Sequence, residues 1–196
     1  MKLDESFYER TDVVKVVKDL LGKTLFTRQS GITTAGVIVE TEAYSWKERG
    51  CHAFGSRKTD RNSIMFANGG HSYVYLCYGI HHLFNVVTNV PGVPEAVLVR
   101  ALQPIEGIEY MRERRRGVSS EVHLTSGPGK LTKALGIDRK FNGKSLLGDD
   151  IWIEDSGFKV RPGTIVASAR IGIDYAGEDA LLPWRFYLRN NAWVSR

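Results

Sequence analysis

Short runs of residues with high β propensity, separated by turn signals rather than by helices, are the feature that most limits what this sequence can fold into. The candidate strands are residues 23–29, 32–44, 72–78, 83–89, 96–102, 150–154 and 164–173, and a Ser30-Gly31 turn joins the first two. Helix start and stop signals predict three helices, over residues 13–21 (after Thr11 or Asp12), 103–116 (from Gln103-Pro104) and 128–135 (from Ser126 and Pro128 to Gly136). Because strands and helices do not alternate regularly, we predict an α+β fold: one compact domain, residues 1–196, with a mainly antiparallel curved sheet, flanking helices and a protruding β-hairpin.

The composition argues against two classes of protein. Hydrophobic residues make up 42% of the 196 residues and charged residues 25%, as in an ordinary globular protein. No apolar run approaches the ~20 residues of a membrane helix, and the charged opening MKLDESFYER lacks the apolar region of a secretory signal. Two cysteines, Cys51 and Cys77, cannot form a disulfide framework. We therefore expect neither a membrane span nor a disulfide scaffold, and a reducing compartment inside the cell.

Positive charge is concentrated in two segments. The net charge is +5 and the isoelectric point about 9.2. Residues 47–61 hold five basic side chains against two acidic ones, and residues 112–116 hold four arginines around Glu113. Such segments can follow a phosphate backbone, but they can equally form a solvated surface, so charge alone leaves both interpretations open.

The strand expected over residues 32–44 carries two carboxylates on one face. Side chains alternate along a strand, so Glu40, Glu42 and Tyr44 share a face, with the two carboxylates roughly 7 Å apart. A polar outer face would explain the pair structurally. In a cleft, one Glu could instead act as a general base whose charge state its neighbour or an arginine sets. A carboxylate pair is also consistent with glycosidic-bond chemistry, because negative charge stabilises an oxocarbenium-like transition state.

Tyrosines cluster in residues 72–79, Ser-Tyr-Val-Tyr-Leu-Cys-Tyr-Gly. Tyr73 and Tyr75 face the same way on an extended strand, and packing within a sheet explains Tyr73. Tyr78 stands beside Gly79 where the chain turns. An exposed ring at such a turn is suited to stacking on bases or wedging between them.

Two other sets of residues resemble a phosphate-binding loop and a metal site, but neither fits the full pattern. The segment Ser126-Gly-Pro-Gly-Lys130 lacks the first glycine and the final Ser/Thr of a phosphate-binding loop, which leaves only the helix N-terminus and Lys130 as a single-phosphate contact. The pairs His81-His82 and Cys51-His52 do not have metal-ligand spacing. We therefore expect no metal and no cofactor.

Seven motifs, taken in order, are more specific than any one alone. They are IVETEAY (38–44), Arg57 with RNSIMF (61–66), YVYLCYG (73–79), Asn85, LVRAL (98–102), SGPGKL (126–131) and RFY (185–187). In this order, from about Leu20 to Val194, they resemble the alkyladenine (3-methyladenine) DNA glycosylase family. The resemblance implies a single-domain, metal-free, monofunctional base-excision enzyme that flips a damaged purine out of duplex DNA and hydrolyses its N-glycosidic bond.

The resemblance also implies catalytic roles. Glu42 matches the general base that activates the attacking water, and Arg100 the arginine that helps to hold that water and the backbone of the flipped nucleotide. The backbone at Ile171 matches the carbonyl lining the water site. Glu40 is then the neighbour held by hydrogen bonds beneath.

The substrate-contacting residues carry over in the same way. Tyr44, His52 and Tyr75 match the aromatic walls around the extruded base, and Asn85 the pocket-floor residue that crowds the exocyclic amine of guanine. Tyr78 matches the tyrosine that fills the gap in the stack. The positions matching phosphate contacts are Arg57, Arg61, Arg115 and Lys130. The segment from Tyr44 to His52 is one residue shorter than in the vertebrate branch, and Ile80-His81 replaces a bulkier pair after the hairpin tip.

Physical chemistry is consistent with this reading. An N-alkylated purine is cationic and has a weakened glycosidic bond, and an aromatic cage favours a cation. Deaminated purines such as hypoxanthine lack that charge, so they are a secondary expectation. The expected partner is double-stranded DNA that contains damaged purines. We expect the protein to act as a monomer and not to bind a membrane. The expected compartment is the bacterial cytoplasm, or the nucleus in a eukaryote. Two alternatives stay open: a basic nucleic-acid-binding module without chemistry, and a hydrolase of nucleosides or carbohydrates that uses Glu40 and Glu42.

Overall fold

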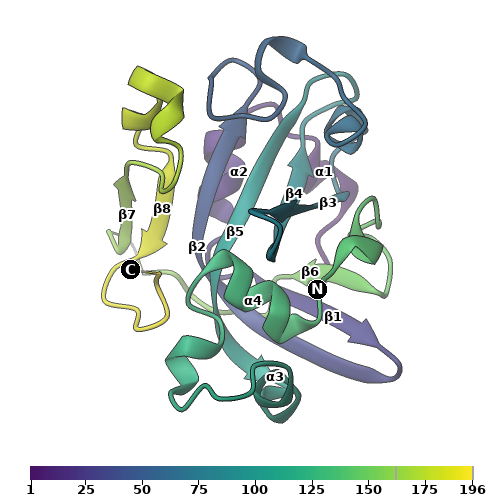
Figure 1. Cartoon of the computed structure of the whole chain (residues 1–196), viewed down its shortest axis with the longest axis vertical. Coiled ribbons are helices and arrows are strands. Elements are labelled where there is room, and N and C mark those ends of the chain that lie inside the picture. Colours follow the sequence, from purple (N-terminus) through teal and green to yellow (C-terminus); the bar gives the residue numbers. More distant parts are fainter. Residues whose placement is uncertain (162, 196) are drawn as a thin grey trace.

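Antiparallel pairing joins all the strands of the protein into one sheet. The computed structural model describes residues 1–161 and 163–195, and in these ranges there are eight strands. They are β1 (Thr24–Gln29), β2 (Ile32–Ser45), β3 (Ser72–Cys77), β4 (His81–Thr88), β5 (Glu95–Glu106), β6 (Ile151–Glu154), β7 (Ile165–Ser168) and β8 (Arg185–Leu188). The main order is β3-β4-β5-β2-β1-β6, and β8 pairs with both β2 and β7 (Figure 1). The predicted α+β fold with an antiparallel sheet is confirmed.

Helices cover both faces of the sheet. In the described ranges the α-helices are α1 (Glu5–Tyr8), α2 (Val13–Asp19), α3 (Ile108–Arg114) and α4 (Pro128–Leu135). Figure 1 shows α2 behind β2 and β5 and α4 in front. The N-cap of α2 is Asp12, whose carboxylate accepts the Lys15 N–H at 3.1 Å. Among the described residues, no helix has both the length and the apolar character needed to cross a membrane.

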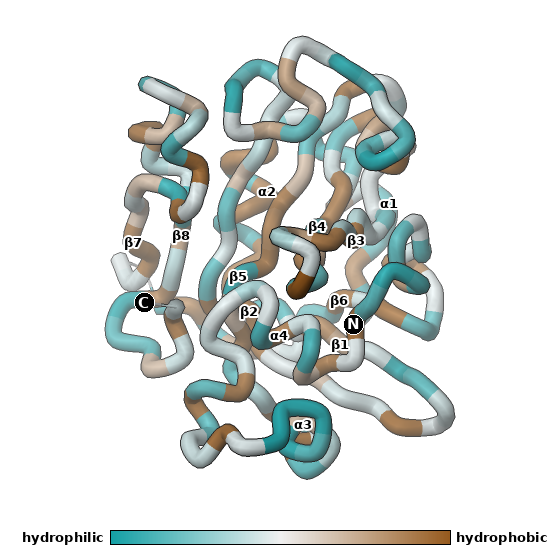
Figure 2. Tube along the Cα trace, viewed as in Figure 1, coloured by the Kyte–Doolittle hydropathy of each residue, from teal (hydrophilic) through white to brown (hydrophobic). Residues whose placement is uncertain are grey.

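The main hydrophobic core lies between these layers. Figure 2 shows the apolar character of β5 at the centre of the molecule, whereas α3 at the edge is hydrophilic. A second, smaller cluster packs under the loops that follow β2. Its buried members are Cys51, Ala53, Met65, Tyr73, Val87 and Ala96. This cluster supports the loop segment around residues 46–66, and residues of that segment line the cavity described below.

The expected helix from Gln103-Pro104 was wrong at its start, because β5 continues to Glu106 and α3 begins only at Ile108. Proline is a favourable first helical residue, but here Pro104 lies opposite Gly36 at a register shift of the β2–β5 pair. Its missing N–H is tolerated at such an irregularity. Gly107 then turns the chain into α3 with φ 67°, and a Cβ at this position would approach the Thr33 carbonyl oxygen.

Two further expectations need correction, and one strand was not predicted. The strand expected over 164–173 is only β7, because the chain leaves the sheet after Ser168. Ser126 is not the N-cap of α4; it forms a β-bridge with Ala101, and Gly127 precedes the helix. Residues 185–188 form β8, which was not predicted as a strand. All three depend on pairings between distant segments.

The predicted hairpin is formed by β3 and β4. Its tip places Tyr78 at φ 49° and Gly79 at φ 72°, and the Ile80 N–H donates to the Cys77 carbonyl at 3.1 Å. Two successive residues with positive φ define a type I′ turn, which matches the twist of paired strands. The Tyr78 side chain at this tip is 87% exposed.

Candidate active site

A cavity of about 720 Å³ opens between the β3–β4 hairpin, the loop after β2, the N-terminus of α4 and the segment after β7. Its volume lies within the range of sites for small molecules. The residues from the sequence prediction that line it are Tyr44, His52, Arg61, Tyr75, Tyr78, Asn85, Arg100, Arg115, Lys130 and Ile171. Arg57 is not among the lining residues and lies exposed on the surface.

Glu42 lies directly behind the wall of this cavity, near the C-terminal end of β2 and fully buried. The Tyr44 hydroxyl donates to its Oε2 at 2.8 Å, and the Ile171 N–H donates to its Oε1 at 2.8 Å. The Arg100 Nη1 lies 3.3 Å from the same Oε1. All three of these neighbours line the cavity, so the carboxylate is held at its edge by groups that face the interior.

Glu40 is separated from the cavity by its own set of donors. Its carboxylate accepts from Arg100 Nε at 2.9 Å, Arg185 Nε at 2.7 Å, and the Ser195 N–H and hydroxyl at 2.6 and 2.8 Å. Three of these donors converge on Oε1 and the Ser195 N–H binds Oε2, so the carboxylate is held mainly through one oxygen. Arg100 thus joins two carboxylates on the same face of β2, as the alternation predicted, but the two have different surroundings.

The charge of Arg100 is secured by this arrangement. Burial by itself lowers the pKa of a guanidinium, but Glu42 and then Glu40 outweigh it and raise the pKa of Arg100. Arg100 is therefore a permanent cation in the cavity wall.

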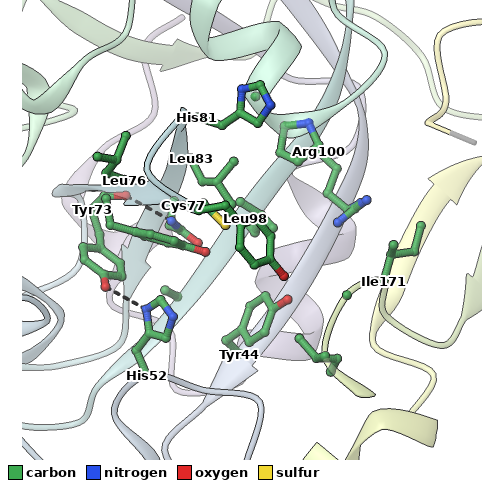
Figure 3. A pocket seen from close by; sticks show the side chains of 18 of the residues that line it. Tyr44, His52, Tyr73, Leu76, Cys77, His81, Leu83, Leu98, Arg100 and Ile171 are labelled. Atoms are coloured by element: carbon green, nitrogen blue, oxygen red, sulfur yellow. Dashed lines mark hydrogen bonds between the residues drawn. The ribbon is translucent and has the colours of Figure 1, made fainter. Parts of the chain in front are cut away.

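Aromatic side chains form the opposite wall (Figure 3). The His52 ring packs edge-on against Tyr75 at 4.6 Å between centroids, and its Nδ1 lies 2.8 Å from the Tyr73 hydroxyl. Desolvation, and then the Arg61 charge, lower the pKa of His52 to about 4. The imidazole is therefore neutral near pH 7. A neutral, aromatic wall attracts a cationic ring without charge repulsion from the histidine.

Tyr44 is held as a neutral phenol. Burial first, and then the adjacent Glu42 carboxylate, raise its pKa well above the ordinary value. Its hydroxyl is thus a permanent donor to Glu42, while its ring faces the cavity (Figure 3). Asn85, on β4, is buried and donates to the Tyr73 carbonyl at 3.1 Å, which fixes its amide at the inner end of the cavity.

Positive side chains surround the entrance. Arg61 lies with Cζ 4.9 Å from the Tyr75 ring centre, so it contacts the aromatic wall as well as the rim. Lys130 is at the start of α4, and Arg115 donates to the His123 carbonyl at 3.0 Å beyond the end of α3. Among the described residues, none of the three forms an ion pair with a carboxylate.

Several residues of the site were not predicted. Tyr73, expected only to pack in the sheet, also orients His52, and the exposed Tyr175 lines the cavity beside Gly50. Arg170, Arg185 and Ser195 contribute charges and donors through contacts between distant segments, which no local pattern indicates. In the described part of the chain, no group of three or more His, Cys, Asp or Glu side chains is arranged to hold a metal ion.

Comparisons with known proteins agree with this geometry. The family model described as methylpurine-DNA glycosylase matches residues 6–192. A Carboxydothermus hydrogenoformans protein, provisionally named a 3-methyladenine DNA glycosylase, is 49% identical over 196 residues, the whole of both chains. Relatives with the same provisional name occur in Chlamydia felis, with 47% identity over 95% of each chain, and in Clostridium acetobutylicum, with 44% identity over 100% of this chain and 98% of the relative. The chain belongs to the methylpurine-DNA glycosylase family.

Proposed function

We propose that this protein is a base-excision repair enzyme that extrudes an alkylated purine from duplex DNA and hydrolyses its N-glycosidic bond. The observation that carries the proposal is the Glu42 carboxylate, held at the edge of an aromatic-lined cavity by Tyr44, Arg100 and the Ile171 N–H. The family match supports the same reaction class.

The proposed catalytic role of Glu42 follows from its hydrogen bonds. Two of the roughly four acceptor positions of its carboxylate are taken by hydrogen bonds, and Arg100 Nη1 lies 3.3 Å from Oε1, so a position is left for a water molecule. In the reaction, Glu42 accepts a proton from that water while the oxygen attacks C1′ of the flipped nucleotide. The glycosidic bond breaks, and its electron pair leaves with the purine. A cationic N-alkylated purine departs as a neutral base, so it needs no general acid.

The cavity is proposed to select its base by charge and shape. Tyr44, His52 and Tyr75 would enclose the purine, and their π faces favour a cation. Asn85 would crowd the exocyclic amine of a normal guanine. Deaminated purines such as hypoxanthine would bind the same walls without the cation–π contribution, so we propose them as slower substrates.

The surface around the cavity is proposed to bind the DNA. Tyr78 at the exposed hairpin tip would fill the space that the flipped nucleotide leaves, as inserted side chains do in other proteins that distort DNA. Arg61, Arg115 and Lys130 at the rim would contact phosphates, and Arg57 would contact a flanking one. We infer that residues 1–196 act as one glycosylase domain, as a monomer, on chromosomal DNA in a bacterial cytoplasm.

The test is base release under single-turnover conditions from duplexes that contain 3-methyladenine, 7-methylguanine, hypoxanthine or ethenoadenine. Glu42→Gln should lower the rate by about 100-fold or more, because general-base catalysis contributes at least that much. Its affinity for an abasic-site duplex should stay close to that of the wild type. Glu95→Gln is the matched control, since Glu95 is also buried but accepts only from Ser45 and Asn89.

Each alternative function gives a different result in this assay. A binding module would hold the duplexes and release no base. A hydrolase of small substrates would cleave free nucleosides and would not need Tyr78 or the arginines. Full activity of Glu42→Gln would remove Glu42 from the role of general base.

A further inference from the structure

Among the residues that the structure describes, Arg170 is the most completely buried cation that the proposed reaction does not use. It lies between β7 and the turn at Asp174–Leu181, and its side chain is 0% exposed. Nη1 and Nη2 donate to the two carboxylate oxygens of Glu48 at 2.8 and 2.7 Å. The same two nitrogens also donate to the carbonyls of Ala43 at 2.9 Å and Asp179 at 3.0 Å. A bidentate pair of this kind fixes geometry as well as charge.

The contacts of Arg170 reach two parts of the proposed catalytic arrangement, the Ile171 N–H and Tyr44. The next residue along the chain is Ile171, whose N–H donates to Glu42. The Ala43 carbonyl that Arg170 binds directly precedes Tyr44, and the guanidinium lies 4.8 Å from the Tyr44 ring centre. Because Tyr44 lines the cavity and Arg170 does not, the guanidinium contacts the ring from behind.

Glu48 extends these contacts to the loop that carries His52. Its Oε2 accepts the Gly50 N–H at 2.7 Å, two residues before His52, and its Oε1 lies 3.4 Å from the Ser45 nitrogen at the end of β2. A single ion pair thus connects β2, the His52 loop and the segment after β7. Figure 3 shows Tyr44, His52 and Ile171 around the common space that these segments enclose.

Stability alone is a weak explanation for such a pair. Removing two charges from water has a cost that their attraction often fails to offset, and apolar residues of similar volume can be equally stable. What apolar residues could not do is hold three separate backbone segments at fixed hydrogen-bond distances. The value of the pair therefore lies in geometry.

We propose that Arg170, through its ion pair with Glu48, is a positioning residue for base excision: it holds the Ile171 N–H and the Tyr44 hydroxyl on Glu42. The inference rests on the proposed function. Loss of the pair would release the segment after β7 and loosen Tyr44 together, and Glu42 would lose its alignment with the water. A displacement of about 1 Å at a reacting group can slow a reaction about 100-fold.

The test compares Arg170→Gln, Glu48→Gln, the double variant and Arg170→Lys in single-turnover base release. Each Gln variant should be slowed about 100-fold, while affinity for an abasic-site duplex stays unchanged. The double variant should be no slower than either single variant, because both substitutions break the same Arg170–Glu48 ion pair. Arg170→Lys should recover part of the rate, since lysine keeps the charge but cannot bind both Glu48 oxygens. Ile153→Ala, a buried change on β6 at the far edge of the sheet, is the control for lowered stability.

The pH dependence separates positioning from stability. The charged and titratable groups around Glu42 are Tyr44 and Arg100 directly, with Arg185 and Glu40 next to Arg100 and Arg170 behind the Tyr44 ring. The acid limb of the rate profile should move in Arg170→Gln, because the variant changes the surroundings of the proposed general base and not only the stability of the fold. It should not move in Ile153→Ala. If Arg170→Gln does not fold, Glu48→Asp provides the same comparison with a shorter carboxylate.

The outcomes distinguish the inference from the proposed function. A wild-type protein that releases no base from any of the damaged duplexes overturns the proposed function. An active wild type, with Arg170→Gln no slower than Ile153→Ala and the acid limb unmoved, overturns only the positioning role of Arg170.

Discussion

Glu42 and Ile171 are joined by a 2.8 Å hydrogen bond from the Ile171 N–H to the Glu42 carboxylate, although 129 residues separate them in the chain. A backbone donor does not titrate and has no rotamers, so it fixes one oxygen of the carboxylate at every pH. The other oxygen is held by the Tyr44 hydroxyl. The orientation of Glu42 therefore depends on one backbone donor and one side-chain donor, with Arg100 Nη1 3.3 Å from Oε1.

The Tyr44 hydroxyl gives the first prediction. Tyr44→Phe removes the hydroxyl and keeps the ring that faces the cavity. We expect base release to slow about tenfold, since a hydrogen bond to a charged group contributes about 1.5–3 kcal/mol and Glu42 retains its other partners. Binding to an abasic-site duplex should not change. Single-turnover kinetics measure the effect, and Tyr110→Phe on α3, away from the cavity, is the control; equal rates for the two variants would contradict the role of the hydroxyl.

The hairpin tip gives a prediction in which stability and binding change in opposite directions. Tyr78 has φ 49° beside Gly79, and Asn-Gly is a favoured pair for this turn. Tyr78→Asn should therefore fold at least as stably as the wild type. It should bind an abasic-site duplex about tenfold more weakly, because stacking on a base contributes about 1–3 kcal/mol.

Two measurements are needed for the Tyr78 variant, a urea unfolding curve and a fluorescence titration with DNA. Tyr78→Phe, which keeps the ring, should bind like the wild type. If Tyr78→Asn binds the abasic duplex with full affinity, the tip does not insert into the stack.

Asn85 in the cavity lining gives a prediction about which bases the protein releases. Asn85→Ala removes the amide that is proposed to crowd the exocyclic amine of guanine. The variant should release normal guanine from undamaged duplex DNA, and it should be about 1 kcal/mol less stable because its hydrogen bond to the Tyr73 carbonyl is lost. Chromatography of the released bases detects the effect. Asn142→Ala, an exposed change of the same kind, should release no guanine; the absence of guanine from both variants would argue against a steric gate.

The lowered pKa of His52 predicts how one contribution to the free energy of unfolding changes with pH. Its pKa falls from 6.5 in the unfolded chain to about 4 in the folded protein, so between these values the unfolded state binds more protons. This contribution therefore makes the fold less stable as pH decreases from 6.5 toward about 4, and it vanishes above that window. His52→Phe should lose less stability than the wild type between about pH 7.5 and about pH 5. Urea unfolding at both pH values measures this, with the exposed His123→Gln as control; parallel losses in wild type and His52→Phe would show that His52 does not titrate in this way.

Local patterns in the sequence predicted those parts of the site that one strand or one turn determines. Alternation along β2 placed Glu40, Glu42 and Tyr44 on one face, and Arg100 contacts both carboxylates in the structure. The Tyr78-Gly79 pair predicted an exposed turn. Such features depend on neighbouring residues alone, so they can be read without knowing the fold.

Features that depend on distant pairings could not be read in this way. Pro104 indicates a helix start when seen alone, and only its pairing with Gly36 keeps it in a strand. β8 has only four residues, too few for their alternation to predict a strand, so its place beside β2 comes from the sheet. Arg170 has no local signal, because each of its hydrogen-bond partners except Asp179 lies more than 100 residues earlier in the chain.

The contact between Ser195 and Glu40 has a consequence for the order in which the protein matures during translation. Glu40 leaves the ribosome early, but two of its four donors belong to a residue made 155 positions later. Until residue 195 has emerged, the Glu40 carboxylate can accept only from Arg100 and Arg185. The donor set of Glu40 is therefore complete only once the C-terminal segment has packed against β2, so this part of the polar face of the strand is among the last to be finished.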